Sequence, residues 1–69
     1  MPHVAITVIP GRDEETKRAL AQKTQAFLVK ELGVDPTFVS VSVQDIPVED
    51  WQKAMEQFSD DILYVKPGV

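Results

Sequence analysis

HVAITVI at residues 3–9 and FVSVSVQ at residues 38–44 are the two stretches that decide the fold. In both of them β-branched apolar residues stand at every second position and alternate with small or polar ones. This period of two is typical of a strand with one buried face and one polar face. We therefore predict two strands, over residues 3–9 and 38–44.

The segment between the two strands has the pattern of a long helix over residues 13–32. Asp13 is suited to cap its first turn, two glutamates follow where they complement the helix dipole, and Gly33 can end it. Apolar residues recur at close to the helical period of 3.6, and they are Ala19, Leu20, Ala26, Phe27, Leu28 and Leu32. We expect this helix to cover the Val and Ile face of both strands.

A strand, a helix and a second strand in this order predict parallel strands with a right-handed crossover. After Pro47, the spacing of Trp51, Ala54, Met55 and Phe58 predicts a short helix over residues 48–58, and Ile62–Val65 is predicted as a short strand or an extended tail. The chain is thus predicted to be one α/β (α+β) domain over residues 1–69. It is a β-α-β subunit with parallel strands, a short second helix and a C-terminal extended tail, oligomerising through the sheet.

The prediction of a homo-oligomer follows from the size of the chain and from the sheet. A chain of 69 residues buries only about 60% of its unfolded surface, and this one has no cysteine for a disulfide. Parallel sheets are usually covered on both faces, whereas one helix covers only one face. The second face is therefore expected to meet another subunit.

Composition excludes several classes of function. With 7 basic and 11 acidic residues and a net charge of −4, the chain is a poor candidate for binding nucleic acid. It has no apolar run of about 20 residues and no signal peptide, so we expect a cytoplasmic protein that does not bind membranes. A single histidine without cysteine makes a zinc site unexpected.

The usual catalytic patterns are also missing, which leaves Pro2 as the residue with special chemistry. When the initiator Met1 is removed, Pro2 becomes the N-terminus and its nitrogen is a secondary amine. An α-amino group titrates near ~7.7–8.0, and both desolvation and a nearby cation lower that value. An amine of this kind is suited to general base catalysis near neutral pH.

Several short segments occur in an order that resembles one known family without a gap from Pro2 to Trp51. They are the proline that opens the first strand, Gly11-Arg12-Asp13-Glu14 with Lys17 one turn on, the long helix, Asp35-Pro36-Thr37, Val39-Ser40-Val41 and Trp51. In this combination the chain resembles the 4-oxalocrotonate tautomerase family, the short members of the tautomerase superfamily with an N-terminal proline.

The resemblance implies a β-α-β subunit that dimerises through its sheets, with dimers that sometimes assemble into hexamers. It also implies keto–enol tautomerisation of a small 2-oxo or 2-hydroxy-enoate acid without metal or cofactor. By the same resemblance Pro2 is the general base, Arg12 binds the substrate carboxylate or steadies the enolate, and Trp51 forms an apolar wall. A guanidinium group such as that of Arg12 suits carboxylate binding because it can form two parallel hydrogen bonds to a carboxylate.

The chain departs from the family at Ser40, where members that process dicarboxylates carry a second arginine. A hydroxyl can donate or accept a hydrogen bond but cannot neutralise a carboxylate. We therefore expect Ser40 to bind substrate without charge, and a monocarboxylate or aryl enol to be favoured over a dicarboxylate. The helical tail resembles the branch of short tautomerases that assemble no further than dimers. The sequence therefore does not decide between a dimer and a hexamer. His3 is expected to be a hydrogen-bonding residue on the inter-subunit face, or else to tune Pro2 or orient substrate.

Two alternative functions remain open from the sequence. A haloacrylate dehalogenase-like activity would need more cationic groups and a water-activating carboxylate near Pro2, which we do not identify. A non-enzymatic oligomeric binding module with the same fold would be favoured if Met1 stayed in place, because an acylated Pro2 has no basic nitrogen.

Overall fold

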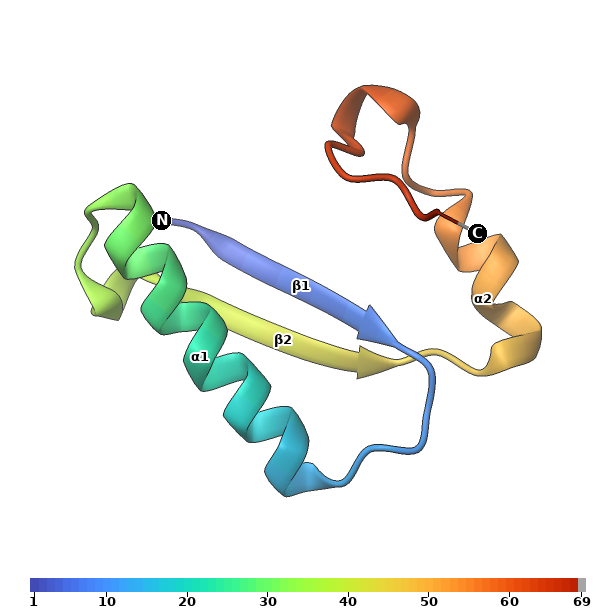
Figure 1. The fold of residues 1–69 in the computed structure, drawn as a ribbon, viewed down its shortest axis with the longest axis horizontal. Helices are drawn as coiled ribbons and strands as arrows, with labels where there is room; N and C mark the ends of the chain where they lie inside the picture. The colour runs from blue at the N-terminus through green and yellow to red at the C-terminus, as the bar shows by residue number, and fades with distance from the viewer. Residues whose placement is uncertain (69) are drawn as a thin grey trace.

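A computed structural model describes residues 1–68, which form a two-stranded parallel sheet with one long helix against it. The elements are β1 (His3–Val8), α1 (Glu14–Leu32), β2 (Ser40–Asp45) and α2 (Val48–Met55), with 3-10 turns at Pro36–Phe38 and Asp60–Ile62. In the sheet His3 lies opposite Ser40, and Val8 lies opposite Asp45 (Figure 1). The predicted β-α-β subunit with parallel strands is confirmed.

Helix α1 begins and ends at the residues that the sequence indicated. The Asp13 carboxylate accepts a hydrogen bond from the backbone N–H of Thr16 at 2.8 Å, and hydrogen bonding to Thr16 lowers the pKa of Asp13. At the other end Gly33 has φ 63°, in the left-handed region, and its N–H donates to the Val29 carbonyl oxygen at 3.0 Å. Glycine adopts this conformation without strain because it has no Cβ to clash with the backbone.

Replacing Gly33 by alanine should therefore destabilise the protein by about 1 kcal/mol. The left-handed conformation costs an L-residue about 1–2 kcal/mol, and the stiffer unfolded chain offsets part of that loss. Chemical unfolding at fixed protein concentration measures the difference. Gly68→Ala is the matched control, because Gly68 has no left-handed φ and no atom within 4 Å of an added Cβ. Equal stability of the two variants would contradict the prediction.

The apolar face of the sheet lies under α1, which packs chiefly against β2. Val39 directly precedes β2 and is the one buried residue of the described chain, with 8% exposure. The alternating Val and Ile side chains of both strands are half-buried, whereas the polar face carries the exposed His3, Ser40 and Ser42. The predicted division of the sheet into two faces is confirmed.

The predicted apolar stripe of α1 is wrong in part. Leu28 is half-buried, but Leu20, Phe27 and Leu32 are 36%, 61% and 57% exposed. The half-buried positions of α1 are Lys17, Ala19, Ala21, Thr24, Gln25, Leu28 and Val29, so Ala19 and Leu28 of the predicted stripe are among them. Most of these positions form one line along the helix. Leu20 and Phe27 lie about 100° around the helix from neighbouring positions on that line, so they face outward.

Two element boundaries differ from the prediction by more than one residue, and in both cases a 3-10 turn is the reason. Asp35 accepts from the Thr37 N–H at 2.9 Å and caps a 3-10 turn, so β2 begins at Ser40 and Phe38 is outside it. Helix α2 ends at Met55, where the Phe58 N–H bonds to the Met55 carbonyl oxygen at 3.1 Å. The tail has a 3-10 turn at Asp60–Ile62 and no strand within residues 62–65, so the prediction of a short strand there is wrong.

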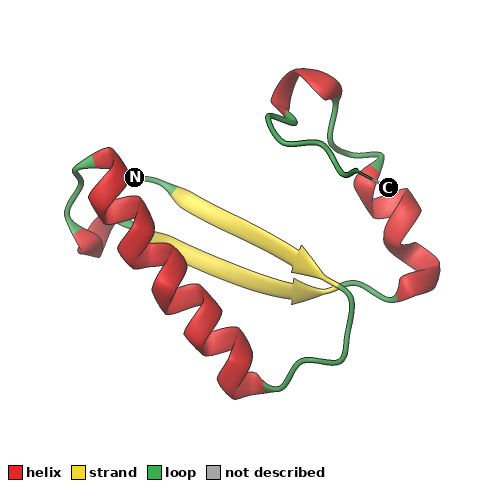
Figure 2. Cartoon of the chain, in the orientation of Figure 1, coloured by secondary structure: helices red, strands yellow, loops and turns green. Residues whose placement is uncertain are grey.

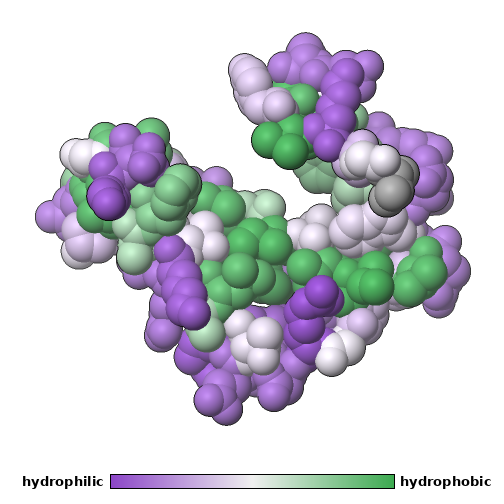
Figure 3. Space-filling model, viewed as in Figure 1, coloured by the Kyte–Doolittle hydropathy of each residue, from purple (hydrophilic) through white to green (hydrophobic). Residues whose placement is uncertain are grey.

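A single chain exposes more surface than a compact protein of its mass. The exposed area is 5731 Å², whereas about 4300 Å² is expected for 7.7 kDa. The radius of gyration is 13.5 Å against about 11 Å for a compact chain of this length. Helix α2 and the tail stand away from the sheet (Figure 2), and hydrophobic surface is exposed across the middle of the molecule (Figure 3). The chain by itself has hardly any core.

Within residues 1–68, no helix combines the length and the apolar character that crossing a membrane requires.

Candidate active site

Pro2 lies at the amino-terminal end of the sheet, next to Ser40. The backbone N–H of Ser40 donates to the Pro2 carbonyl oxygen at 3.2 Å, so the pairing of the two strands extends one residue beyond β1. Pro2 is half-buried and Ser40 is exposed. Two of the residues predicted for the site are therefore brought together by strand pairing.

His3 joins Ser40 and Ser42 on the polar face of the sheet. Its Nδ1 lies 2.6 Å from Ser40 Oγ, and its Nε2 lies 3.1 Å from Ser42 Oγ. The geometry follows from the register, because His3 is paired with Ser40 and Ser42 is the next residue of β2 on the same face. His3 is thus a hydrogen-bonding residue, as expected.

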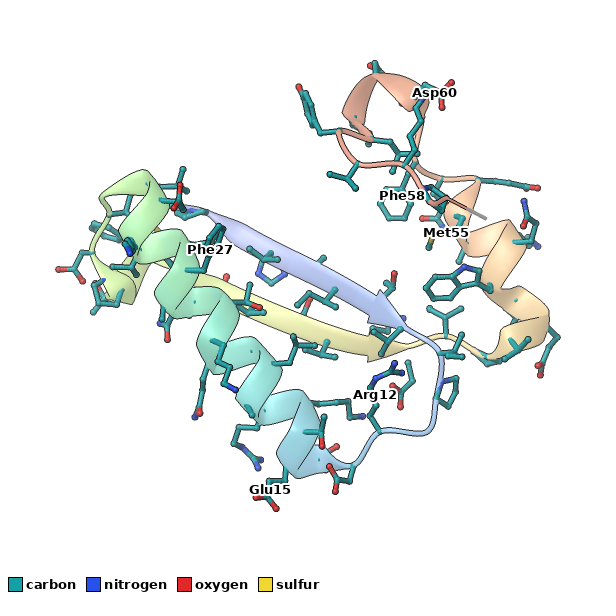
Figure 4. All side chains as sticks on the ribbon, viewed as in Figure 1. Arg12, Glu15, Phe27, Met55, Phe58 and Asp60 are labelled. Atoms are coloured by element: carbon teal, nitrogen blue, oxygen red, sulfur yellow. The ribbon has the colours of Figure 1, made fainter. Side chains whose placement is uncertain are left out.

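Arg12 lies at the opposite end of β1. Gly11, with φ 132°, turns the chain after the strand, and Arg12 Nη1 donates to the Ile9 carbonyl oxygen at 3.3 Å. Figure 4 shows Arg12 beside the carboxyl ends of the strands. The Arg12 side chain is exposed, and none of the ion pairs within residues 1–68 includes it. Its guanidinium is therefore available to an anion from outside the chain.

Lys17, in the first turns of α1, already has anionic partners. Its Nζ is 3.2 Å from Asp45 Oδ2 and 3.6 Å from Glu14 Oε1. The hydrogen bond to Asp45 raises the pKa of Lys17, and this outweighs the opposing effect of desolvation. Lys17 fastens the start of α1 to the end of β2, so its charge is already paired, whereas that of Arg12 is not.

Trp51 belongs to α2, which begins at the same end of the sheet as Arg12. The Ile46 N–H donates to the Val8 carbonyl oxygen at 2.8 Å, and α2 starts two residues later at Val48. Trp51 is half-buried. Further along this segment, Met55 and Phe58 lie on the part that leads away from the sheet (Figure 4).

The four predicted site residues therefore fall into two groups at opposite ends of one subunit. Pro2 and Ser40 lie at one end of the strands, and Arg12 and the start of α2 lie at the other. Seven residue steps of extended chain separate Pro2 from Ile9, which corresponds to about 20 Å. One subunit does not bring Pro2 and Arg12 to a common substrate.

Sequence reasoning missed Ser42 as a member of the Pro2 end. The signal was a histidine on one strand and two serines at alternate positions on the other. It becomes readable only when the register shows that His3 faces Ser40, because a shift of one residue would turn the serines to the opposite face.

Within residues 1–68 there is no cluster of three or more histidine, aspartate or glutamate side chains placed to hold a metal ion.

Comparison with known proteins adds the class to this geometry. A family described as tautomerase enzyme matches residues 2–61, a match that begins at Pro2 and includes both ends of the sheet. The chain belongs to this tautomerase family of isomerases, as the resemblance predicted.

Among individual relatives, the chain is similar to a probable tautomerase of Xylella fastidiosa, at 38% identity over 53 residues. These residues cover 77% of this chain and 65% of that protein, which is slightly under two thirds of its length. A probable tautomerase of Ralstonia nicotianae is 31% identical over 61 residues, covering 88% of this chain and 94% of that protein. A 2-hydroxymuconate tautomerase of Comamonas testosteroni is 37% identical over 51 residues, covering 74% and 81%.

Proposed function

We propose that the chain, after removal of Met1, catalyses keto–enol proton transfer on small 2-oxo and 2-hydroxy-enoate acids. The Pro2 amine acts as the general base when the enol forms, and its ammonium form returns the proton to carbon in the opposite direction. The observation that carries the proposal is the family match that begins at Pro2, together with the position of Pro2 at the open end of the sheet. Met1 is 97% exposed, so an aminopeptidase can reach it.

Arg12 is proposed to bind the substrate carboxylate. Guanidinium forms two parallel hydrogen bonds to a carboxylate, and its charge also stabilises the enolate-like transition state. Trp51 is proposed to form an apolar wall, which strengthens these charge interactions by excluding water. The unpaired guanidinium of Arg12 supports this assignment.

The distance between Pro2 and Arg12 leads us to propose that each site is shared by two subunits. In a two-fold symmetric dimer with antiparallel sheets, the start of β1 in one subunit lies beside the end of β1 in its partner. Pro2 and Ser40 then meet Arg12 and Trp51 of the partner subunit. The large exposed area of the single chain supports this assembly.

The proposed substrate class is an enol with one carboxylate. Ser40 carries no charge and Lys17 is occupied by Asp45, so of these residues and Arg12 only Arg12 offers a charge to the substrate. A relative named 2-hydroxymuconate tautomerase acts on a dicarboxylate by its name. In this chain a second carboxylate would have to be desolvated without a partner, which is costly.

Ultraviolet-monitored ketonisation of phenylenolpyruvate and 2-hydroxymuconate tests the function, using protein whose intact mass shows that Met1 is absent. We expect kcat/KM to be about tenfold higher for the aryl monocarboxylate, because a charged hydrogen bond contributes about 1.5 kcal/mol or more. Ser40→Arg should narrow or reverse this preference by adding the missing cation. Faster turnover of the dicarboxylate by the unaltered protein would contradict the substrate class, and no rate on either enol would overturn the proposed function.

A further inference from the structure

The polar face of the sheet holds a continuous chain of three side chains, Ser40, His3 and Ser42. Both ring nitrogens of His3 are engaged, at 2.6 Å to Ser40 Oγ and 3.1 Å to Ser42 Oγ. All three residues are exposed, and Ser40 also contacts Pro2 through the backbone. This chain of hydrogen bonds therefore begins beside the proposed base and ends two residues further along β2, at Ser42.

The direction of the hydrogen bonds in this chain can reverse. A neutral imidazole has one N–H and one lone pair, so one serine donates to the ring while the other accepts from it. When Ser40 donates to Nδ1, its free lone pair can accept a hydrogen bond from a ligand. When Nδ1 carries the hydrogen, Ser40 accepts from the ring and its own O–H can donate to a ligand.

This reversal matches what happens to the reacting oxygen in the proposed reaction. The enol oxygen carries a hydrogen and donates it, whereas the carbonyl oxygen of the keto form only accepts. A group that contacts this oxygen throughout the reaction must change from acceptor to donor. Ser40 can do so because His3 exchanges its tautomer.

We propose that Ser40 contacts the reacting oxygen of the substrate and that His3 and Ser42 relay the proton which this oxygen releases. The inference rests on the proposed function and deepens it. Ser40 is the group that touches substrate, and His3 and Ser42 are positioning residues that act through it. Their neighbours on this face of the strands, Ala5, Thr7 and Gln44, carry no charge.

The step balances as follows in the direction of the ketone. The π electrons of the C=C bond form a C–H bond with a proton from the Pro2 ammonium, whose N–H electron pair stays on nitrogen. The enol O–H pair becomes the C=O π bond, and the enol proton passes to Ser40 Oγ. The Ser40 hydrogen moves to Nδ1, the Nε2 hydrogen moves to Ser42 Oγ, and the Ser42 hydrogen leaves to water. Water then returns a proton to Pro2.

The test compares Ser42→Ala and His3→Phe with the unaltered protein in phenylenolpyruvate ketonisation. Ser42 does not touch substrate in this proposal, so Ser42→Ala should lower kcat about tenfold and leave KM within about twofold; the loss falls below the usual range for proton transfer because water partly replaces the hydroxyl. His3→Phe keeps a planar ring without nitrogens, and kcat should fall at least as far. Thr24→Val is the matched control, since it removes a hydroxyl from α1, on the opposite side of the sheet.

A second measurement starts with the unaltered protein, whose result does not depend on the folding of a variant. In mixtures of H₂O and D₂O, a step that moves several protons gives a curved plot of rate against deuterium fraction. Ser42→Ala should bring this plot closer to a straight line. The relay is wrong if Ser42→Ala keeps the kcat of Thr24→Val, or if it changes KM alone. Those outcomes leave Pro2-dependent activity intact, whereas loss of the proposed function itself appears as an unaltered protein without activity on either enol.

Discussion

Pro2→Ala should lower kcat/KM for phenylenolpyruvate ketonisation by about 10²-fold. Proton transfer by a positioned side chain contributes about 10²- to 10⁴-fold. Alanine retains a primary N-terminal amine, but that amine rotates freely and is not held in a ring, so we expect a loss near the lower limit. Initial rates over a range of enol concentrations, on protein without Met1, measure it.

Pro67→Ala is the matched control for this substitution, because Pro67 lies in the tail after the last 3-10 turn. Its rate should stay within about twofold of the unaltered protein, as is usual for an exposed position away from the site. A second control is protein that retains Met1, in which Pro2 is an amide and cannot accept a proton. If Pro2→Ala were as active as Pro67→Ala, the general base role would be wrong.

Mixing Pro2→Ala subunits with Arg12→Ala subunits should restore activity that neither variant has alone. Each variant should be reduced by about 10²-fold or more, since one lacks the base and the other lacks the charge that stabilises the transition state. If Pro2 and Arg12 of one site come from different subunits, a mixed dimer contains one complete site. Random pairing of equal amounts then gives roughly a quarter of the unaltered activity.

The control mixture combines Pro2→Ala with the double variant that lacks both Pro2 and Arg12. No pairing in this mixture creates a complete site, so its activity should stay at the level of the parents. Exchange is ensured by expressing the two chains together and confirming both masses in the purified protein. Absence of restoration in the first mixture would show that Pro2 and Arg12 serve the same subunit, against the proposed shared site.

Local patterns predicted the strands and the helix limits because those limits depend on nearby residues. Asp13 and Gly33 set the limits of α1 through hydrogen bonds to residues three or four positions away. The alternating valines determine which face of each strand packs against the helix. Phe38 was misassigned because the capping interaction of Asp35 competes with the strand pattern and continues a 3-10 turn as far as Phe38. The alternation of apolar and polar residues does not by itself show where the 3-10 turn replaces the strand.

The outward position of Phe27 and the layout of the candidate site depend on contacts that lie far apart in the sequence. The rotation of α1 is set by its packing on β2, and a 3.6-residue period alone does not choose between neighbouring apolar lines. The resemblance named Pro2 and Arg12 as partners, but only the parallel pairing of the strands shows that they lie at opposite ends. The hydrogen bonds of His3 likewise require the register.

The small core of the isolated subunit has a consequence for the fate of the protein in the cell. With Val39 as the only buried side chain within residues 1–68, one subunit gains little free energy from folding alone, so its stability should rise with its own concentration. Newly made chains that have not yet met a partner should be opened and digested by proteases faster than assembled ones. Subunits made at low concentration would then be degraded before they find a partner. The amount of assembled protein would depend on the encounter rate of its subunits as well as on their expression.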